Sequence, residues 1–299
     1  MEITAKMVKE LRDKTNAGMM DCKKALRETG GDMEKARDWL REHGLATVNK
    51  RSGRVAREGV VATAISEDGK KGGIVEFNTE TDFVAKLESF RGIAKNIATA
   101  LTRGPACSGV DALLNVTCPV CGRVFSEVIT ENTATTGEKS EIRRFAVMET
   151  EAPNAFLHAY DHAGEKLSVL LMAACEKPGP AAQEAAHTLA MQIAASNPLA
   201  VAIEDLPAEV VERERKVAME IARQTGKDEK YLAKIAEGQL TKFYEDCVLL
   251  EQEYIREPKL TVGKWLDSLK DELGAVSVQA FVRYQLAEEL ASEKEPDAE

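Results

Sequence analysis

Apolar residues recur at helical spacing through the first fifty residues of the chain. Thr4 is placed to cap a first helix, residues 16–18 interrupt it, and residues 30–31 end a second helix. Asp32 is placed to cap a third helix, which we expect to end at Gly44. The apolar positions are Met7, Val8, Leu11, Met20, Cys22, Ala25, Leu26, Met33, Ala36 and Leu40. This pattern predicts a small three-helix bundle.

A different pattern begins near residue 59. Residues 60–65 and 74–77 are apolar runs that flank a turn containing Gly69, which predicts a β-hairpin. Apolar positions from Phe90 to Leu101 then follow helical spacing as far as Gly104. A hairpin needs cover on one face, so we expect this helix to pack against it. Residues 46–58, which are basic and weakly apolar, indicate a linker before the hairpin.

The second half of the chain repeats the alternation of strands and helices. Strands are predicted over residues 142–148, 156–160 and 167–174, and a helix ends at residues 197–198. Residues 276–286 alternate between apolar and polar positions, which is typical of a half-buried strand.

A helical insertion separates these segments. Pro207 begins one predicted helix, residues 226–228 break it, and a second helix follows. Each helix carries an apolar stripe, which predicts an antiparallel pair.

Composition and charge exclude several classes of function. The 299 residues are 44% hydrophobic and 30% charged, so the chain can bury a core, and its length predicts more than one domain. Aromatic residues make up only 5% and the net charge is −10, which argues against nucleic-acid binding. We find neither a secretory signal nor a membrane-spanning stretch, so we expect a cytoplasmic protein that works through protein contacts.

Residues 78–85 contain the most informative chemistry. They lie between a predicted strand and a predicted helix, where loops commonly carry function. In one interpretation Thr81 caps the helix, Asp82 favours its dipole and Phe83 joins the core. In the other, the carboxylate and the aromatic ring project into a partner. The residues alone favour the first interpretation.

Several stretches resemble the elongation factor Ts family. The sequence TDFVA at residues 81–85 is similar to that family's signature, and a second match covers residues 9–12 and 18–26. Three further similar stretches, at residues 142–145, 191–198 and 261–263, occur in the family's order. The resemblance therefore favours the second interpretation, in which the Phe83 ring projects into a partner.

The resemblance implies an α+β fold. The expected parts are a three-helix bundle of the ubiquitin-associated type with its linker, two α+β core subdomains, and an inserted antiparallel helical hairpin of the dimerisation type. On this sequence they correspond to residues 1–54, 55–148, 149–199 with 258–290, and 200–257.

The resemblance also implies a function. Members of the family are guanine-nucleotide exchange factors for the GTPase elongation factor Tu, so the expected partner is its GDP-bound form. We expect no cofactor and no direct contact with nucleic acid, and a homodimer is compatible with the hairpin. The residues expected to bind the partner and displace its magnesium ion are Thr81, Asp82, Phe83 and Val84. Further contacts are implied at Leu11, Met19, Met20 and His162.

Enzyme chemistry is not predicted. The chain has no complete phosphate-binding loop of the G-x-x-x-x-G-K-S/T type and no G-x-S-x-G motif. Cys118 and Cys121 form one C-x-x-C pair, which is half of a zinc site, and no second pair follows. A reduced pair is therefore the favoured interpretation. Two alternatives to an exchange factor stay open: a non-catalytic adaptor and a C-x-x-C metal or redox protein.

Overall fold

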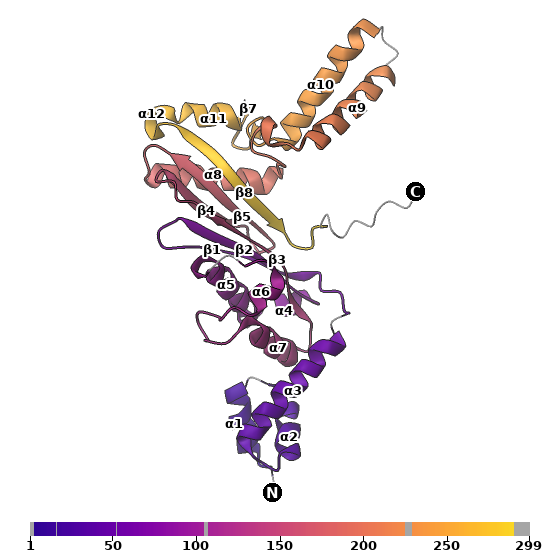
Figure 1. The fold of residues 1–299 in the computed structure, drawn as a ribbon, viewed down its shortest axis with the longest axis vertical. Coiled ribbons are helices and arrows are strands. Elements are labelled where there is room, and N and C mark those ends of the chain that lie inside the picture. The colour runs from indigo at the N-terminus through magenta and orange to yellow at the C-terminus, as the bar shows by residue number, and fades with distance from the viewer. Residues whose placement is uncertain (1–2, 16, 52, 105–106, 225–228, 290–299) are drawn as a thin grey trace.

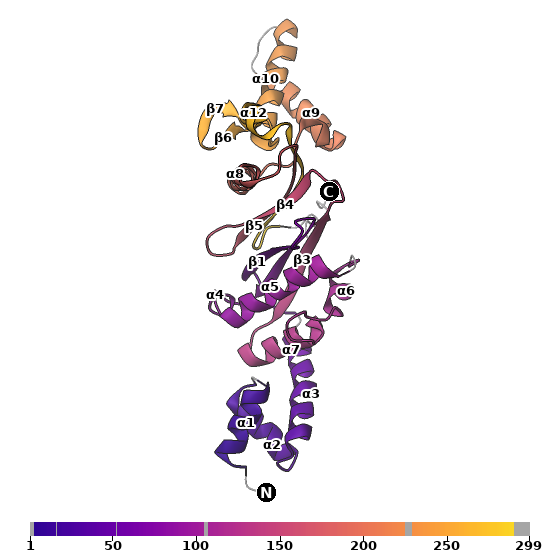
Figure 2. The same ribbon diagram turned by 90° about the vertical axis from the view of Figure 1, so that its left-hand side faces the viewer.

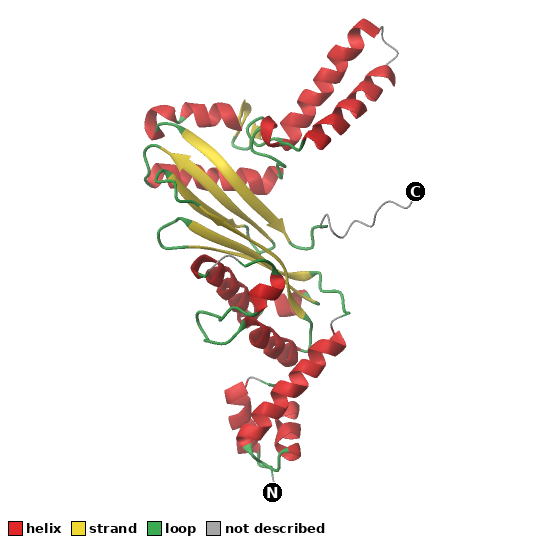
Figure 3. Cartoon of the chain, viewed as in Figure 1, coloured by secondary structure: helices red, strands yellow, loops and turns green. Residues whose placement is uncertain are grey.

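The computed structural model describes residues 3–15, 17–51, 53–104, 107–224 and 229–289. It is an α+β structure, as predicted, and it is elongated (Figures 1 and 3). A helical bundle lies at the end with the N-terminus, two β-sheets lie in the middle, and a pair of long helices projects at the other end.

The N-terminal bundle contains α1 (Ala5–Thr15), α2 (Met19–Glu28) and α3 (Met33–Arg51). The Thr4 hydroxyl accepts a hydrogen bond from the backbone N–H of Met7 at 3.3 Å, and the Asp32 carboxylate accepts from two N–H groups in the first turn of α3. Both predicted caps are therefore present. Six buried residues form the core: Val8, Leu11, Cys22, Ala25, Leu26 and Ala36.

The prediction that α3 ends at Gly44 is wrong, because the helix continues to Arg51. A glycine inside a helix costs about 1 kcal/mol relative to alanine and does not by itself end the helix. Packing against the core offsets this cost: α3 contacts α7 (Phe125–Thr136), and Arg41 forms an ion pair with Glu127. Residues 46–51 of the expected linker are thus helical.

The first sheet contains β1 (Glu58–Ile65), β2 (Lys71–Thr79) and β3 (Ser140–Glu149), antiparallel and in that order. The predicted helix is α5 (Glu88–Arg103), which packs on β1 and β2. Its Phe90 stacks on Phe77 of β2 with the ring centroids 4.5 Å apart. Gly73 permits this approach, because a Cβ atom there would lie 2.6 Å from the Cβ of Leu101.

Two helices between α5 and β3 were not predicted from the pattern. They are α6 (Val110–Leu114) and α7, and both pack on the same side of the first sheet as α5. The fully buried Phe125 begins α7. The polar character of residues 126–136 hides the helix from a search for apolar periodicity.

The second sheet contains β4 (Ala155–Asp161), β5 (Leu167–Cys175) and β8 (Val276–Gln285), with β5 in the centre. Helix α8 (Pro180–Ser196) covers it and ends at Asn197, which adopts the left-handed conformation with φ of 45°. The remaining elements are β6 (Glu253–Tyr254), β7 (Glu257–Thr261), α11 (Val262–Ser268) and α12 (Lys270–Leu273).

The two sheets pack face to face. Val61 and Ile74 of the first sheet and Leu157 and Leu170 of the second belong to one buried cluster between them. Figure 2 shows α5 and α8 on opposite sides of the strands. The core is therefore a layered structure in which helices cover both outer faces.

The projecting pair contains α9 (Ala208–Gln224) and α10 (Glu229–Cys247), preceded by the short helix η1 (Ile203–Asp205). Their mutual contact has three buried alanines at its centre, against which Met219, Leu232 and Ile235 pack; the alanines are Ala218, Ala222 and Ala236. The break expected at residues 226–228 lies outside the described residues. No helix within the described part of the chain is long and apolar enough to cross a bilayer.

Candidate partner-binding site

The segment after β2 forms a short, ordered turn, which we call the 80–87 turn (residues 80–87). It contains the one-turn helix α4 (Asp82–Ala85) and leads directly into α5 (Figure 2). Three backbone hydrogen bonds close it, from the N–H groups of Ala85, Lys86 and Leu87, at 3.0–3.2 Å. The turn is therefore held by its own backbone as well as by the strand and the helix that flank it.

Phe83 points away from the protein. Its side chain is 79% exposed, although Val84 and Ala85 beside it are buried under the first sheet. Leu87, one helical turn later, is also an exposed apolar residue. The interpretation that places Phe83 in the core is therefore not what the structure shows. Val84 anchors the turn and Phe83 is the part that projects.

Asp82 carries a negative charge beside this ring. The Nζ atom of Lys86 lies 2.6 Å from its carboxylate. The hydrogen bond from Lys86, aided by the positive charges of Lys86 and Lys166, lowers the pKa of Asp82 below its ordinary value. Asp82 is consequently ionised throughout the neutral pH range.

Thr81 does not cap α4 with its side chain. Its backbone is extended and stands at the N-cap position, but its hydroxyl donates a hydrogen bond to the carboxylate of Glu138 at 2.7 Å. Glu138 also accepts from the Thr81 N–H at 2.9 Å and from the Thr79 hydroxyl at 3.1 Å. One carboxylate thus holds the start of the 80–87 turn in three places.

A second carboxylate completes this arrangement from the opposite side. Glu80 accepts a hydrogen bond from the backbone N–H of Lys139 at 2.7 Å and forms an ion pair with Arg54 at 3.0 Å. Glu138 and Lys139 follow the end of α7, so the two segments exchange carboxylate contacts. Patterns along the sequence do not indicate these contacts of Glu80 and Glu138, because their partners are far apart along the chain.

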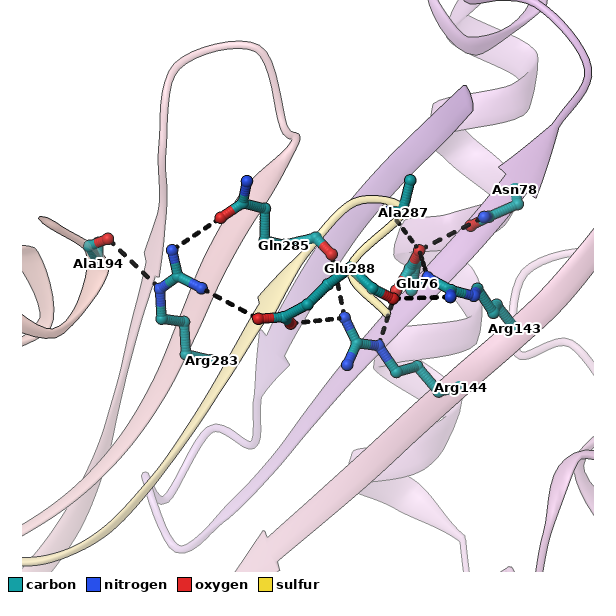
Figure 4. A network of polar contacts seen from close by, with 9 residues as sticks. All are labelled: Glu76, Asn78, Arg143, Arg144, Ala194, Arg283, Gln285, Ala287 and Glu288. Atoms are coloured by element: carbon teal, nitrogen blue, oxygen red, sulfur yellow. Dashed lines mark hydrogen bonds and ion pairs between the residues drawn. The ribbon is translucent and has the colours of Figure 1, made fainter. Parts of the chain in front are cut away.

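A buried network of ion pairs surrounds Glu76 of β2 (Figure 4). Glu76 is fully buried, and its carboxylate forms ion pairs with Arg143 at 3.0 Å and with Arg144 at 2.7 Å. It also accepts from the backbone N–H of Ala287, and Arg144 lies over the ring of Tyr284. The network joins the strand that leads into the 80–87 turn to β3 and to the segment after β8.

The same network includes Glu288, which follows β8. Its carboxylate lies 3.1 Å from Arg144 and 3.6 Å from Arg283 (Figure 4). Arginine pairs with carboxylates through several directed donors, which suits a buried site. In the sequence, Arg143 and Arg144 stand out only as part of the family-like stretch at residues 142–145.

The other predicted contact residues are divided among separate regions. Met19 and Met20 are 56% and 72% exposed at the start of α2, in the N-terminal bundle. Leu11 is 1% exposed and lies in the core of that bundle, so its side chain is not on the surface. His162 lies in the turn after β4, where its Nδ1 atom is 2.8 Å from the Tyr160 hydroxyl. None of these belongs to the 80–87 turn.

Two of the histidines, His158 and His187, are in contact, and Tyr160 connects them to a third, His162. His158 Nε2 is 3.2 Å from His187 Nδ1, and Tyr160 packs edge-on against His187. Burial, opposed by a hydrogen bond with Gln183, lowers the pKa of His158. Strand alternation places His158 and Tyr160 on one face of β4, but His162 lies in the turn after the strand and His187 comes from α8, so the sequence did not indicate this cluster.

The Cys118–Cys121 pair lies in a turn between α6 and α7. Cys118 is buried and Cys121 is exposed. Across the described residues, no group of three or more histidine, cysteine, aspartate or glutamate side chains is arranged to hold a metal ion. We therefore assign no metal to this pair, and the weak possibility of a zinc half-site gains no further ligand from the structure.

Comparison with known proteins identifies the family. A family model described as "Elongation factor TS" matches residues 80–288, which begin at the 80–87 turn and include β3 of the first sheet and the whole second sheet. Elongation factor Ts of Clostridium botulinum strain Loch Maree is 41% identical over 298 residues, covering 99% of this chain and 96% of the relative. The same protein from strain Alaska E43 is 42% identical, covering 99% and 97%.

The chain belongs to the elongation factor Ts family. It is accordingly a translation elongation factor, as the resemblance predicted. The relatives are matched along almost their whole length, so the N-terminal bundle and the projecting helices fall within the shared region.

Proposed function

We propose that this chain acts on elongation factor Tu in its GDP-bound form and accelerates the release of GDP, so that GTP can bind. Family membership supports elongation factor Tu as the partner. The observation that carries the proposal is Phe83, a large aromatic side chain that is 79% exposed on an otherwise anchored turn. Single aromatic anchors of this kind contribute much of the affinity at protein interfaces.

The geometry of the 80–87 turn suits a wedge. Phe83 enters an apolar cleft of the GTPase, and the ionised Asp82 approaches the ligands of the magnesium ion that holds GDP. Magnesium demands near-ideal octahedral geometry, so a small displacement of its ligands weakens it. Val84 and the Glu138 contacts keep the turn in place while the partner deforms.

The mechanism requires no covalent chemistry and no cofactor. Linkage makes the effect reciprocal: if the chain weakens GDP binding, GDP weakens the binding of the chain by the same factor. GTP then refills the empty site. The chain acts in the cytoplasm and without direct contact with nucleic acid.

The two ends of the molecule have separate roles in this proposal. Exposed Met19 and Met20 give the N-terminal bundle an adaptable apolar surface that contributes affinity. Val217 and Tyr231, on α9 and α10, are 46% and 50% exposed and offer a surface for a second copy of the chain.

The decisive experiment measures GDP release. Elongation factor Tu is loaded with fluorescent GDP, and a substoichiometric amount of the chain is added with excess unlabelled nucleotide. The proposal expects rapid, catalytic release. An adaptor would bind the GTPase and leave the rate of release unchanged, and that result would exclude exchange.

A further inference from the structure

Backbone hydrogen bonds fix the conformation of the C-x-x-C turn. Thr117 pairs with Val124 as a β-bridge, the N–H of Cys118 donates to the Arg123 carbonyl at 2.7 Å, and the N–H of Gly122 donates to the Cys118 carbonyl at 3.0 Å. These bonds close a tight loop over residues 118–123 that holds both cysteines. The two cysteines form a preorganised dithiol.

The two thiols differ in accessibility. Cys118 is 1% exposed and belongs to the core under the first sheet, whereas Cys121 is exposed at the tip of the turn. An oxidant in solution can therefore reach Cys121 first. The buried Cys118 is placed to react only with the oxidised form of Cys121.

The surroundings of Cys121 favour the thiolate. Partial burial alone would raise its pKa, but the backbone N–H of Arg123, the Cys118 thiol and the Arg123 guanidinium together lower it below the ordinary value. Arg123 is also paired with Glu131. The thiolate is the reactive form of cysteine.

Three other cysteines have the opposite character. Burial raises the pKa of Cys22, Cys175 and Cys247, and all three are buried. Buried thiols with raised pKa values react slowly with oxidants. The contrast points to selective chemistry at the turn.

We propose that Cys121 and Cys118 form a peroxide-sensitive dithiol, in which Cys121 is oxidised first and Cys118 resolves the product as a disulfide. The Cys121 thiolate attacks one oxygen of a hydroperoxide, so that the O–O bond breaks, an S–O bond forms and the remaining oxygen leaves as an alcohol or water. Sulfur loses two electrons and the peroxide gains them. The Cys118 sulfur then attacks Cys121, forms the S–S bond and expels the hydroxyl group, which leaves as water with the Cys118 proton.

The site is independent of the proposed exchange activity. It precedes α7, whereas Glu138 follows the other end of that helix. An accessible, low-pKa thiol beside a resolving cysteine is the arrangement found in redox sensors. A dithiol that only packed the core would have no reason to expose one sulfur beside a guanidinium.

The test uses the full chain, reduced, freed of metal with a chelator and titrated with hydrogen peroxide. Alkylation and peptide mass spectrometry then follow each of the six cysteines. We expect the peptide holding residues 118–121 to lose two hydrogens as its disulfide forms, at a peroxide dose that leaves Cys22, Cys175 and Cys247 reduced. Preferential oxidation of any other cysteine would overturn the proposal.

Variants separate the two roles. In Cys118→Ser, Cys121 should accumulate as a sulfenic acid that dimedone traps, and in Cys121→Ser, Cys118 should stay reduced. Arg123→Gln should slow the oxidation of Cys121 severalfold, while Cys107→Ser should leave it unchanged. Because Cys118 is buried, the exposed-site variant Cys121→Ser keeps the test valid if Cys118→Ser does not fold.

If the two cysteines bind zinc instead, the same experiment gives a different result. Protein purified without chelator is analysed for zinc and then exposed to peroxide. Stoichiometric zinc that protects the pair from oxidation would overturn the redox assignment in favour of a site shared between two chains. Zinc-free protein with unchanged peroxide sensitivity supports it.

Discussion

The two halves of the core follow one plan and differ in what connects their second strands to their helices. Each has a hairpin, a helix that covers it and a third strand that pairs with the second. Each also has a register shift against the third strand, at Glu76/Phe77 in the first sheet and at Met172/Ala173 in the second. The connection after β5 is the short sequence 176–179, whereas the one after β2 carries the 80–87 turn.

The difference shows where this fold carries function. The repeated plan supplies two rigid layers, and only one connection presents an exposed aromatic ring. The first half also carries charged groups at that connection: Glu138 holds the turn, and Glu76 anchors the strand that leads into it. In the second half, the residues at the register shift, Met172 and Ala173, are apolar.

The largest expected effect concerns stability. Glu76→Gln leaves two arginines without their buried counter-charge, which should cost about 3–5 kcal/mol of unfolding free energy. Met172→Leu, at the matching register shift of the second sheet, should cost less than about 1.5 kcal/mol. Urea denaturation of both variants measures the two losses. Equal losses would show that the two sheets do not differ in how they are held.

The next effect concerns exchange. Phe83→Ala should lower the rate of GDP release by roughly thirtyfold or more, which corresponds to about 2 kcal/mol for loss of an interface anchor. Its stability should stay within about 0.5 kcal/mol, because the ring is exposed. Leu199→Ala, which truncates an exposed apolar residue of the second half, is the matched control. If Phe83→Ala released GDP as fast as the parent protein, the proposal that Phe83 acts as a wedge would be wrong.

Glu138→Gln tests whether holding the turn matters for exchange. The amide keeps the size but loses the charge that strengthens three hydrogen bonds, which predicts a loss of about 1–1.5 kcal/mol, or roughly five- to tenfold, in the maximal rate. The affinity for the partner should change little, because Phe83 remains. Titration of the exchange rate against chain concentration separates the two quantities. Glu141→Gln, which removes a nearby carboxylate from the ion pair with Lys139, should leave both unchanged.

The smallest effect concerns Asp82. Asp82→Asn keeps the shape and removes the charge, so the exchange rate should fall about fivefold, as expected for roughly 1 kcal/mol of charge interaction near a surface. The parent and the variant should converge when magnesium is chelated. Lys86→Gln, which retains the Asp82 charge, should not show the loss. A ratio of parent to variant that chelation leaves constant would separate Asp82 from the magnesium ion.

The sequence by itself determined most of the elements. Periodicity identified the hairpin of residues 60–77, helix α5 and the alternating strand β8, because side chains that face a core repeat with the geometry of the element. The signature at residues 81–85 located the candidate site. Local pattern also gave the caps at Thr4 and Asp32, since a cap involves only neighbouring residues.

Only the tertiary structure decided what each side chain of the site faces. The residues alone favoured a buried Phe83, and only the family resemblance favoured its projection, because an apolar residue on a helix fits either environment. The structure shows that Phe83 is exposed and that Leu11, an expected contact, is buried. It also did not reveal that Glu138 holds Thr81 across 57 residues, or that Glu76 is buried between two arginines. Hydrogen bonds of this kind form wherever folding brings donors and acceptors together, and their partners leave no periodic trace along the chain.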